Sequence, residues 1–157
     1  MTRETAPLQP LTPDEEAVAR AFGRAIIVLP RAIDADLTRE QRLTLNEYSV
    51  LMHLSEAPDR RLRMSELAAA CDVSLSGMTR IVGRLENDGL VERVQCAEDA
   101  RGSNAVLTDA GLTRLERAYP THLASTRRHI MDHLEGLDLA RLAEALRNFA
   151  TPAGDRP

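Results

Sequence analysis

The segment 64–89 constrains the fold most, because it holds two short helical patterns joined by a very tight connection. The first pattern, in residues 65–72, repeats apolar side chains at helical spacing. The second begins after Ser74, whose hydroxyl is suited to cap a helix, and runs to Asp88, where Gly89 can end it in a left-handed conformation. Two helices joined this tightly predict a helix-turn-helix motif.

The second helix of this motif has two contrasting faces. Its predicted inward face is apolar and consists of Met78, Ile81, Val82 and Leu85. The opposite face carries small polar residues and arginines without an acid: Ser76, Gly77, Thr79, Arg80, Gly83, Arg84 and Asn87. Such a helix fits the major groove of duplex DNA, where hydroxyls and the helix N-terminus can bind phosphates and arginines can bind guanine edges. The predicted contacts to double-stranded DNA are therefore Ser74, Ser76, Gly77, Thr79, Arg80 and Arg84.

A β-hairpin is predicted directly after this motif. The runs LVERVQ at 90–95 and NAVL at 104–107 are typical of strands, and the turn-rich run CAEDARGS joins them. At the tip, Arg101 could reach the minor groove, where a narrow AT-rich stretch concentrates negative potential, and Asp99 could hold that arginine by an ion pair. Both residues join the predicted DNA-contacting set.

The charge of the chain leaves a competing interpretation open. The formal net charge is -4 and all 20 basic residues are arginines, so binding to DNA would have to rest on local placement of charge. Arginines on an exposed helix are often simply solvated, and Arg80 could instead pair with Glu66 or Glu86. The same motif could also serve as a protein–protein interaction module, which an acidic helix face would have favoured.

Amphipathic helices are predicted on both sides of the motif and hairpin. Apolar residues recur at helical spacing over 14–36, and Thr44 starts a capping box that opens a helix over 44–57. After the hairpin, a long helix is expected over 108–136 and a last one over 138–150. No window has the roughly 18 consecutive apolar residues of a membrane span, and the N-terminus lacks the pattern of a signal peptide. A cytoplasmic protein without a membrane partner is expected.

Three sequence runs resemble the MarR family of bacterial transcriptional regulators: LTLNEYSVLMHL, SELAAACDVSLSGMTRIVGRLENDGLVER and EDARGSNAVLTDAG. The resemblance covers 43–111, and its most specific part is DxR at 99–101 followed by LTxxG at 107–111. Ala105 departs from the branched aliphatic residue that is usual in the family. The resemblance implies a mainly α fold with a small β wing: a winged helix-turn-helix with N- and C-terminal dimerisation helices.

The resemblance also implies a division of the chain and a dimer. The expected parts are a flexible N-terminal arm (1–13), a helical dimerisation region (14–42 and 109–150), a DNA-binding lobe (43–108) and a flexible tail (151–157). A homodimer would read a pseudo-palindromic operator. The residues expected at the dimer contact are Phe22, Ile26, Leu142, Leu146 and Phe149.

Family members bind small amphipathic molecules, often aromatic acids, between the dimer helices and the DNA-binding lobe. The resemblance therefore implies a repressor released by a small aromatic or anionic effector. By position, the candidates for lining the effector pocket are Arg24, Tyr48, Met52 and His53. Tyr48 and Met52 could equally be ordinary core residues.

Other kinds of regulator and an enzyme are less well supported. Cys71 lies on an apolar face and Cys96 lies near acids, so neither favours a redox-sensing thiolate. The spacing of His122, His129 and His133 puts them on one face of the predicted helix, but about 10 Å separates the first two, too far for one metal ion. No catalytic or nucleotide-binding motif occurs. We expect no enzyme activity, no cofactor and no metal.

Overall fold

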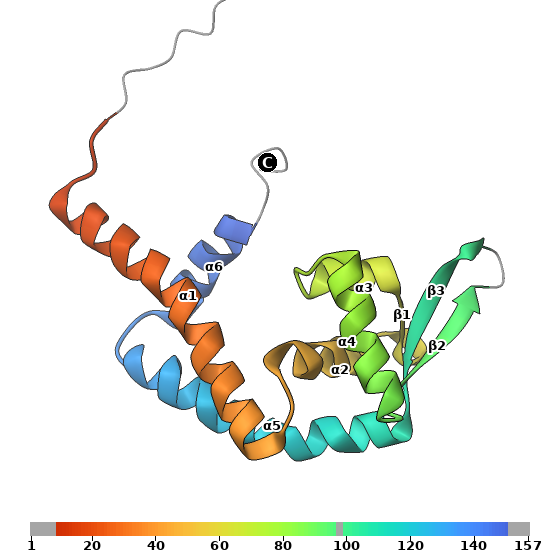
Figure 1. Ribbon diagram of the computed structural model, residues 1–157. Helices are drawn as coiled ribbons and strands as arrows, with labels where there is room; N and C mark the ends of the chain where they lie inside the picture. The colour runs from red at the N-terminus through yellow and green to blue at the C-terminus, as the bar shows by residue number, and fades with distance from the viewer. Residues whose placement is uncertain (1–8, 97–98, 151–157) are drawn as a thin grey trace, which may run out of the picture.

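The chain folds mainly into helices with one small sheet (Figure 1). The computed structural model describes residues 9–96 and 99–150, without the side chains of residues 96, 99–101 and 150. The elements in chain order are α1 (Pro13–Gln41), α2 (Leu45–Glu56), the short 3-10 helix η1 (Pro58–Arg60), β1 (Arg61–Arg63), α3 (Met64–Ala70), α4 (Leu75–Asn87), β2 (Val91–Cys96), β3 (Asp99–Leu107), α5 (Asp109–His129), the 3-10 helix η2 (Met131–His133) and α6 (Leu139–Ala150). This architecture confirms the predicted winged helix-turn-helix with long helices at both ends.

Helices α2, α3 and α4 pack with the sheet into one lobe. The C-terminal part of α1 contacts α2, its N-terminal part and α6 lie apart from the lobe, and α5 runs between the two regions (Figure 1). One apolar core connects these parts. It takes fully buried side chains from α1, α2, α3, α4, β3 and α5, among them Leu37, Leu51, Leu67, Val82, Ala105 and Ala118. Burial of this shared core is what fixes the lobe against α5.

The sheet is antiparallel, with the strand order β1-β3-β2. The hairpin of β2 and β3 forms the predicted wing and extends away from the helices (Figure 1). Strand β1 was not predicted, and it pairs with β3 from Arg61 opposite Val106 to Arg63 opposite Asn104. This pairing places Arg61 and Arg63, which precede α3 in the chain, at the base of the wing.

The helix starts follow the capping residues that the sequence indicates. The side chains of Thr44, Ser74 and Thr108 each accept a hydrogen bond from the backbone N–H three residues on. A further capping box, formed by Thr12 and Glu15, opens α1 one residue earlier than expected. Helix α1 also continues five residues beyond the predicted end at residue 36, to Gln41.

Helix α5 begins in tight contact with the turn that follows α4. The Thr108 hydroxyl donates to the Leu90 carbonyl at 3.0 Å. A Cβ on Gly111 would lie 2.1 Å from the same carbonyl oxygen, so only glycine fits at this position. Gly89 has a φ of +71°, as predicted for the residue that ends α4.

The predicted continuous helix over 108–136 is wrong, because α5 ends at His129. Ile130 packs against the core with φ -127° and ψ -66°, outside the helical region, and the separate turn η2 follows. His133 therefore lies in η2, so the three histidines predicted on one helical face do not share a helix.

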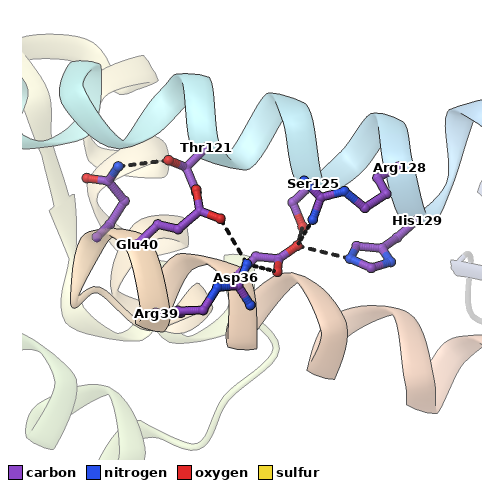
Figure 2. A network of polar contacts seen from close by, with 8 residues as sticks. Asp36, Arg39, Glu40, Thr121, Ser125, Arg128 and His129 are labelled. Carbon is purple, nitrogen blue, oxygen red and sulfur yellow. Dashed lines mark hydrogen bonds and ion pairs between the residues drawn. The ribbon is translucent and has the colours of Figure 1, made fainter.

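A buried carboxylate joins α1 to α5 (Figure 2). Asp36 of α1 is 5% exposed, and its Oδ2 accepts hydrogen bonds from Ser125 Oγ at 2.7 Å and His129 Nε2 at 3.0 Å, both on α5. Arg128 Nη1 lies 3.3 Å from the same oxygen, while Arg39 Nη2 lies 2.6 Å from Oδ1. Ser125, Arg128 and His129 of α5 thus share one carboxylate partner on α1.

These bonds set the protonation state of Asp36. The hydrogen bonds from Ser125, Arg39 and His129, in that order, hold the pKa of the Asp36 carboxyl far below its usual range, although burial opposes them. Asp36 therefore carries its charge in the folded protein at every pH near neutrality. Because the pKa is lower in the folded than in the unfolded chain, this charge stabilises the fold above about pH 4.

Replacing Asp36 with asparagine tests this account of the α1–α5 contact. The asparagine amide has no charge and one acceptor fewer, so we expect a loss of about 2 kcal/mol in the free energy of unfolding at pH 7. The difference from the unmodified protein should shrink as the pH falls below about 4, where the unfolded carboxyl becomes protonated. Urea unfolding followed by circular dichroism at pH 7 and pH 3 measures both effects.

Asp132→Asn is the matched control, since Asp132 is exposed and makes no hydrogen bond to any residue that the structure describes. It should change the free energy of unfolding by less than about 0.5 kcal/mol. An Asp36→Asn protein as stable as this control at pH 7 would show that the carboxylate does not hold the two helices together.

Candidate nucleic-acid interface

Helix α4 presents its polar face outward on a firm apolar support. Its predicted inward residues Met78, Ile81, Val82 and Leu85 are all buried. The Oγ of the N-cap Ser74 accepts from the Gly77 N–H at 3.1 Å, and the Oγ of Ser76 lies 3.2 Å from it. Both hydroxyls are exposed at the N-terminus of a 13-residue helix, where the helix dipole favours an anion such as a phosphate.

Arg80 stands exposed on this face and makes no ion pair or hydrogen bond with the residues that the structure describes. The two acids that could have paired with Arg80, Glu66 and Glu86, bind other residues instead. Glu86 accepts two bonds from the Arg93 guanidinium and one from the Arg93 backbone N–H, and Glu66 accepts the backbone N–H of Arg63. The guanidinium of Arg80 is therefore available to an external acceptor.

Arg84, on the same face, is held differently. Its Nε donates to Glu47 Oε1 at 2.9 Å, across 37 residues of sequence. Burial alone would raise the pKa of Glu47, but bonds from the Thr44 backbone and from Arg84 lower it below its usual value. Arg84 thus ties α4 to the start of α2, through a contact between residues far apart in the sequence.

A hollow of about 310 Å³ lies where α3 and α4 meet the wing. Two arginines and three hydroxyl side chains contribute to its lining, which consists of Arg63, Met64, Ser65, Leu75, Thr79, Arg93, Gly102 and Ser103. Arg93 was not among the predicted contacts, because only the folded hairpin brings it beside α4. The side chains of Asp99 and Arg101, predicted to form an ion pair at the wing tip, lie outside the described residues.

The predicted effector residues separate into two groups. Tyr48 and Met52 line a pocket of about 440 Å³ between α2 and α5, although Tyr48 is also part of the core. Arg24 and His53 do not line this pocket. The other lining residues are Ser55, Glu56, Leu115, Glu116, Tyr119 and His122.

The predicted dimerisation residues lie together on α1 and α6. The rings of Phe22 and Phe149 contact edge to face, with their centroids 5.2 Å apart. Ile26, Leu146 and Phe149 remain exposed, and Leu142 is half-buried. An apolar hollow of about 550 Å³ opens between the two helices. The described chain thus leaves a continuous apolar surface uncovered at this end.

Comparisons with known proteins agree with this geometry. The model of the MarR family matches residues 43–102. The crystal structure of Sco3205, a MarR family transcriptional regulator from Streptomyces coelicolor solved in complex with DNA, is 35% identical with a TM-score of 0.83, over 93% of this chain and 94% of Sco3205. AbsC, a MarR family transcriptional regulator from the same organism, is 38% identical with a TM-score of 0.80, over 91% of this chain and 96% of AbsC. This chain belongs to the MarR family.

Two curated transcriptional repressors match shorter stretches. The HTH-type transcriptional repressor YetL from Bacillus subtilis is 35% identical over 82 residues, which are 52% of this chain and 49% of YetL. The HTH-type transcriptional repressor IacR from Pseudomonas putida is 31% identical over 100 residues, which are 64% of this chain and 56% of IacR. The chain thus spans about half the length of the curated relatives it matches.

The possible redox and metal sensors of this MarR family chain are its cysteines and groups of metal-binding side chains. Burial raises the pKa of the Cys71 thiol, which disfavours a reactive thiolate. Cys96 has no described side chain. Among the residues described, no group of three His, Cys, Asp or Glu side chains could hold a metal ion. Over the same residues, no helix combines the length and apolarity needed to cross a membrane.

Proposed function

We propose that this MarR family protein is a dimeric transcriptional regulator that binds a specific sequence in duplex DNA. The observation that carries the proposal is Arg80, an arginine without a partner among the described residues, on the exposed acid-free face of α4. The DNA complex of Sco3205 supports DNA as the partner, and the repressor names of YetL and IacR support repression. As a bacterial gene regulator it would act in the cytoplasm.

In this proposal α4 enters the major groove, where some of its residues bind phosphates and Arg80 binds a base. Ser74, Ser76 and the helix N-terminus bind a phosphate, which sets the register of the helix on DNA. Arg80 donates two bonds to a guanine edge and supplies sequence preference. Thr79 and Arg93, which line the hollow beside the wing, bind a neighbouring phosphate.

The proposed roles of the other parts of the chain follow its predicted division into a DNA-binding lobe and a dimerisation region. Residues 43–108 form the DNA-binding lobe, and residues 14–42 and 109–150 form the dimerisation region. Arg101 at the wing tip reaches into the minor groove, with Asp99 beside it. An effector in the pocket between α2 and α5 lies at the junction of the two regions, so its binding changes the spacing of the two α4 helices and releases DNA.

A winged helix used only for protein contact is less well supported. The outward face of α4 offers hydroxyls and an arginine without an exposed large apolar anchor apart from Leu75. Enzyme activity is also less well supported, because Sco3205 and AbsC are both transcriptional regulators. The family consists of transcriptional regulators.

Arg80→Ala tests direct readout of DNA sequence by α4. Loss of a bidentate contact to guanine should cost about 1 to 3 kcal/mol of binding free energy on the operator and relax preference at one base pair per half-site. Arg84→Ala should change base preference much less, because Glu47 holds that arginine. Fluorescence anisotropy with operator, single-base operator variants and random duplex measures both. An Arg80→Ala protein that loses equal affinity for operator and random duplex would contradict readout.

Substitutions on the exposed apolar surface of α1 and α6 test the dimer. Ile26→Glu and Leu146→Glu place charges on side chains that are 57% and 43% exposed in one chain, so each subunit should still fold. In a dimer those charges would be buried, and we expect dissociation to be at least about 100-fold easier. Sedimentation velocity measures the change. Val94→Glu, at an exposed position on β2, should keep the dimer, and dimers of all three variants would refute this interface.

A further inference from the structure

The pocket between α2 and α5 has the size of a small-molecule site. Its volume of about 440 Å³ falls within the range of 300–1,000 Å³ typical of ligand pockets. Leu115 and Met52 supply apolar wall, and Tyr119, 53% exposed, stands at the mouth. The site can therefore accept a small ring-containing molecule from solvent.

Aromatic side chains form one side of this pocket. The rings of Tyr48 and His122 are stacked, with centroids 4.4 Å apart and planes 16° from parallel. Burial lowers the pKa of His122, so its imidazole is uncharged at neutral pH and adds no positive charge to the pocket. Tyrosine faces attract cations through the ring quadrupole, and they stack equally well with a ligand ring.

The charged residues of the pocket are both acids. Among the described residues that line it, Glu56 and Glu116 carry charge and no arginine is present. Both side chains are exposed, and neither has an ion-pair partner in the described part of the chain. Glu56 is also the last residue of α2, where the negative end of the helix dipole adds to its own charge. The electrostatic field at this site therefore favours a positive ligand.

We infer that this pocket binds a small aromatic cation, meaning a ring system that carries a protonated amine or a quaternary nitrogen. The ring lies against Tyr48 and Tyr119, and the cationic group lies near Glu56 and Glu116. The aromatic acid implied by the resemblance would bring a third negative charge to two unneutralised carboxylates. The inference rests on the proposed function in one respect, that occupancy of this pocket is read out as release of DNA.

Three probes with the same ring and different charge test the ligand class: 2-naphthylmethylammonium, 2-naphthoate and 2-naphthylmethanol. Calorimetric titration of the full chain at low ionic strength, where charge is least screened, should show the ammonium binding at least about 10-fold more tightly than naphthoate, with the alcohol between them. The double substitution Glu56→Gln and Glu116→Gln keeps the side-chain shape and should bring the ammonium and naphthoate affinities within about twofold of each other. Glu144→Gln, exposed on α6, should leave the original preference intact.

Each other outcome overturns the inference. Tighter binding of naphthoate, equal binding of all three probes, or no binding because a second copy of the chain covers the pocket would each do so. A preference for the ammonium that survives in the Glu56→Gln, Glu116→Gln protein would assign the cation to another site. Operator binding without any probe, measured in parallel, keeps the two proposals apart: protein that binds operator and no ammonium contradicts this inference alone, whereas protein that binds the ammonium and no operator contradicts the proposed function alone.

Discussion

The arrangement of the whole chain depends on one buried carboxylate, that of Asp36. A buried charge is tolerated only where hydrogen bonds satisfy it, and here Ser125 and His129 of α5 and Arg39 of α1 provide them. The same helix α5 packs against the DNA-binding lobe at its other end, with Gly111 against the Leu90 carbonyl. In addition to the shared core, α1 and the lobe are thus each held against α5 by a specific contact, one near each end of that helix.

Local pairing of charges explains how a chain of negative net charge can present the surface that we propose for DNA. Glu47 forms an ion pair with Arg84, and Glu86 forms one with Arg93. Arg80 is exposed and has no partner among the described residues. Positive charge is thus used locally, at α4 and the wing. The pocket between α2 and α5 shows the opposite balance of charge, so in the proposed function the ligand and the DNA would bind at surfaces of opposite charge.

Local patterns predicted most of the fold, because caps and periodicity act within a few residues. Ser74 and Gly89 mark both ends of α4, and the buried stripe between them has the predicted spacing. Strand β1 was missed since three residues are too few to show alternation. The end of α5 was missed because the packing of Ile130 overrides helical periodicity there. The bond between Arg84 and Glu47 joins residues far apart in sequence, and no local pattern records such a contact.

The central claim is that two copies of α4 read one DNA sequence as a symmetric pair. Selection of bound duplex fragments from the genome of the source organism, followed by sequencing, tests this most directly. The account predicts one enriched pseudo-palindrome whose half-sites are centred about one helical turn, roughly 10 base pairs, apart. Recovery of fragments with no shared motif, or of a motif without two-fold symmetry, would contradict it.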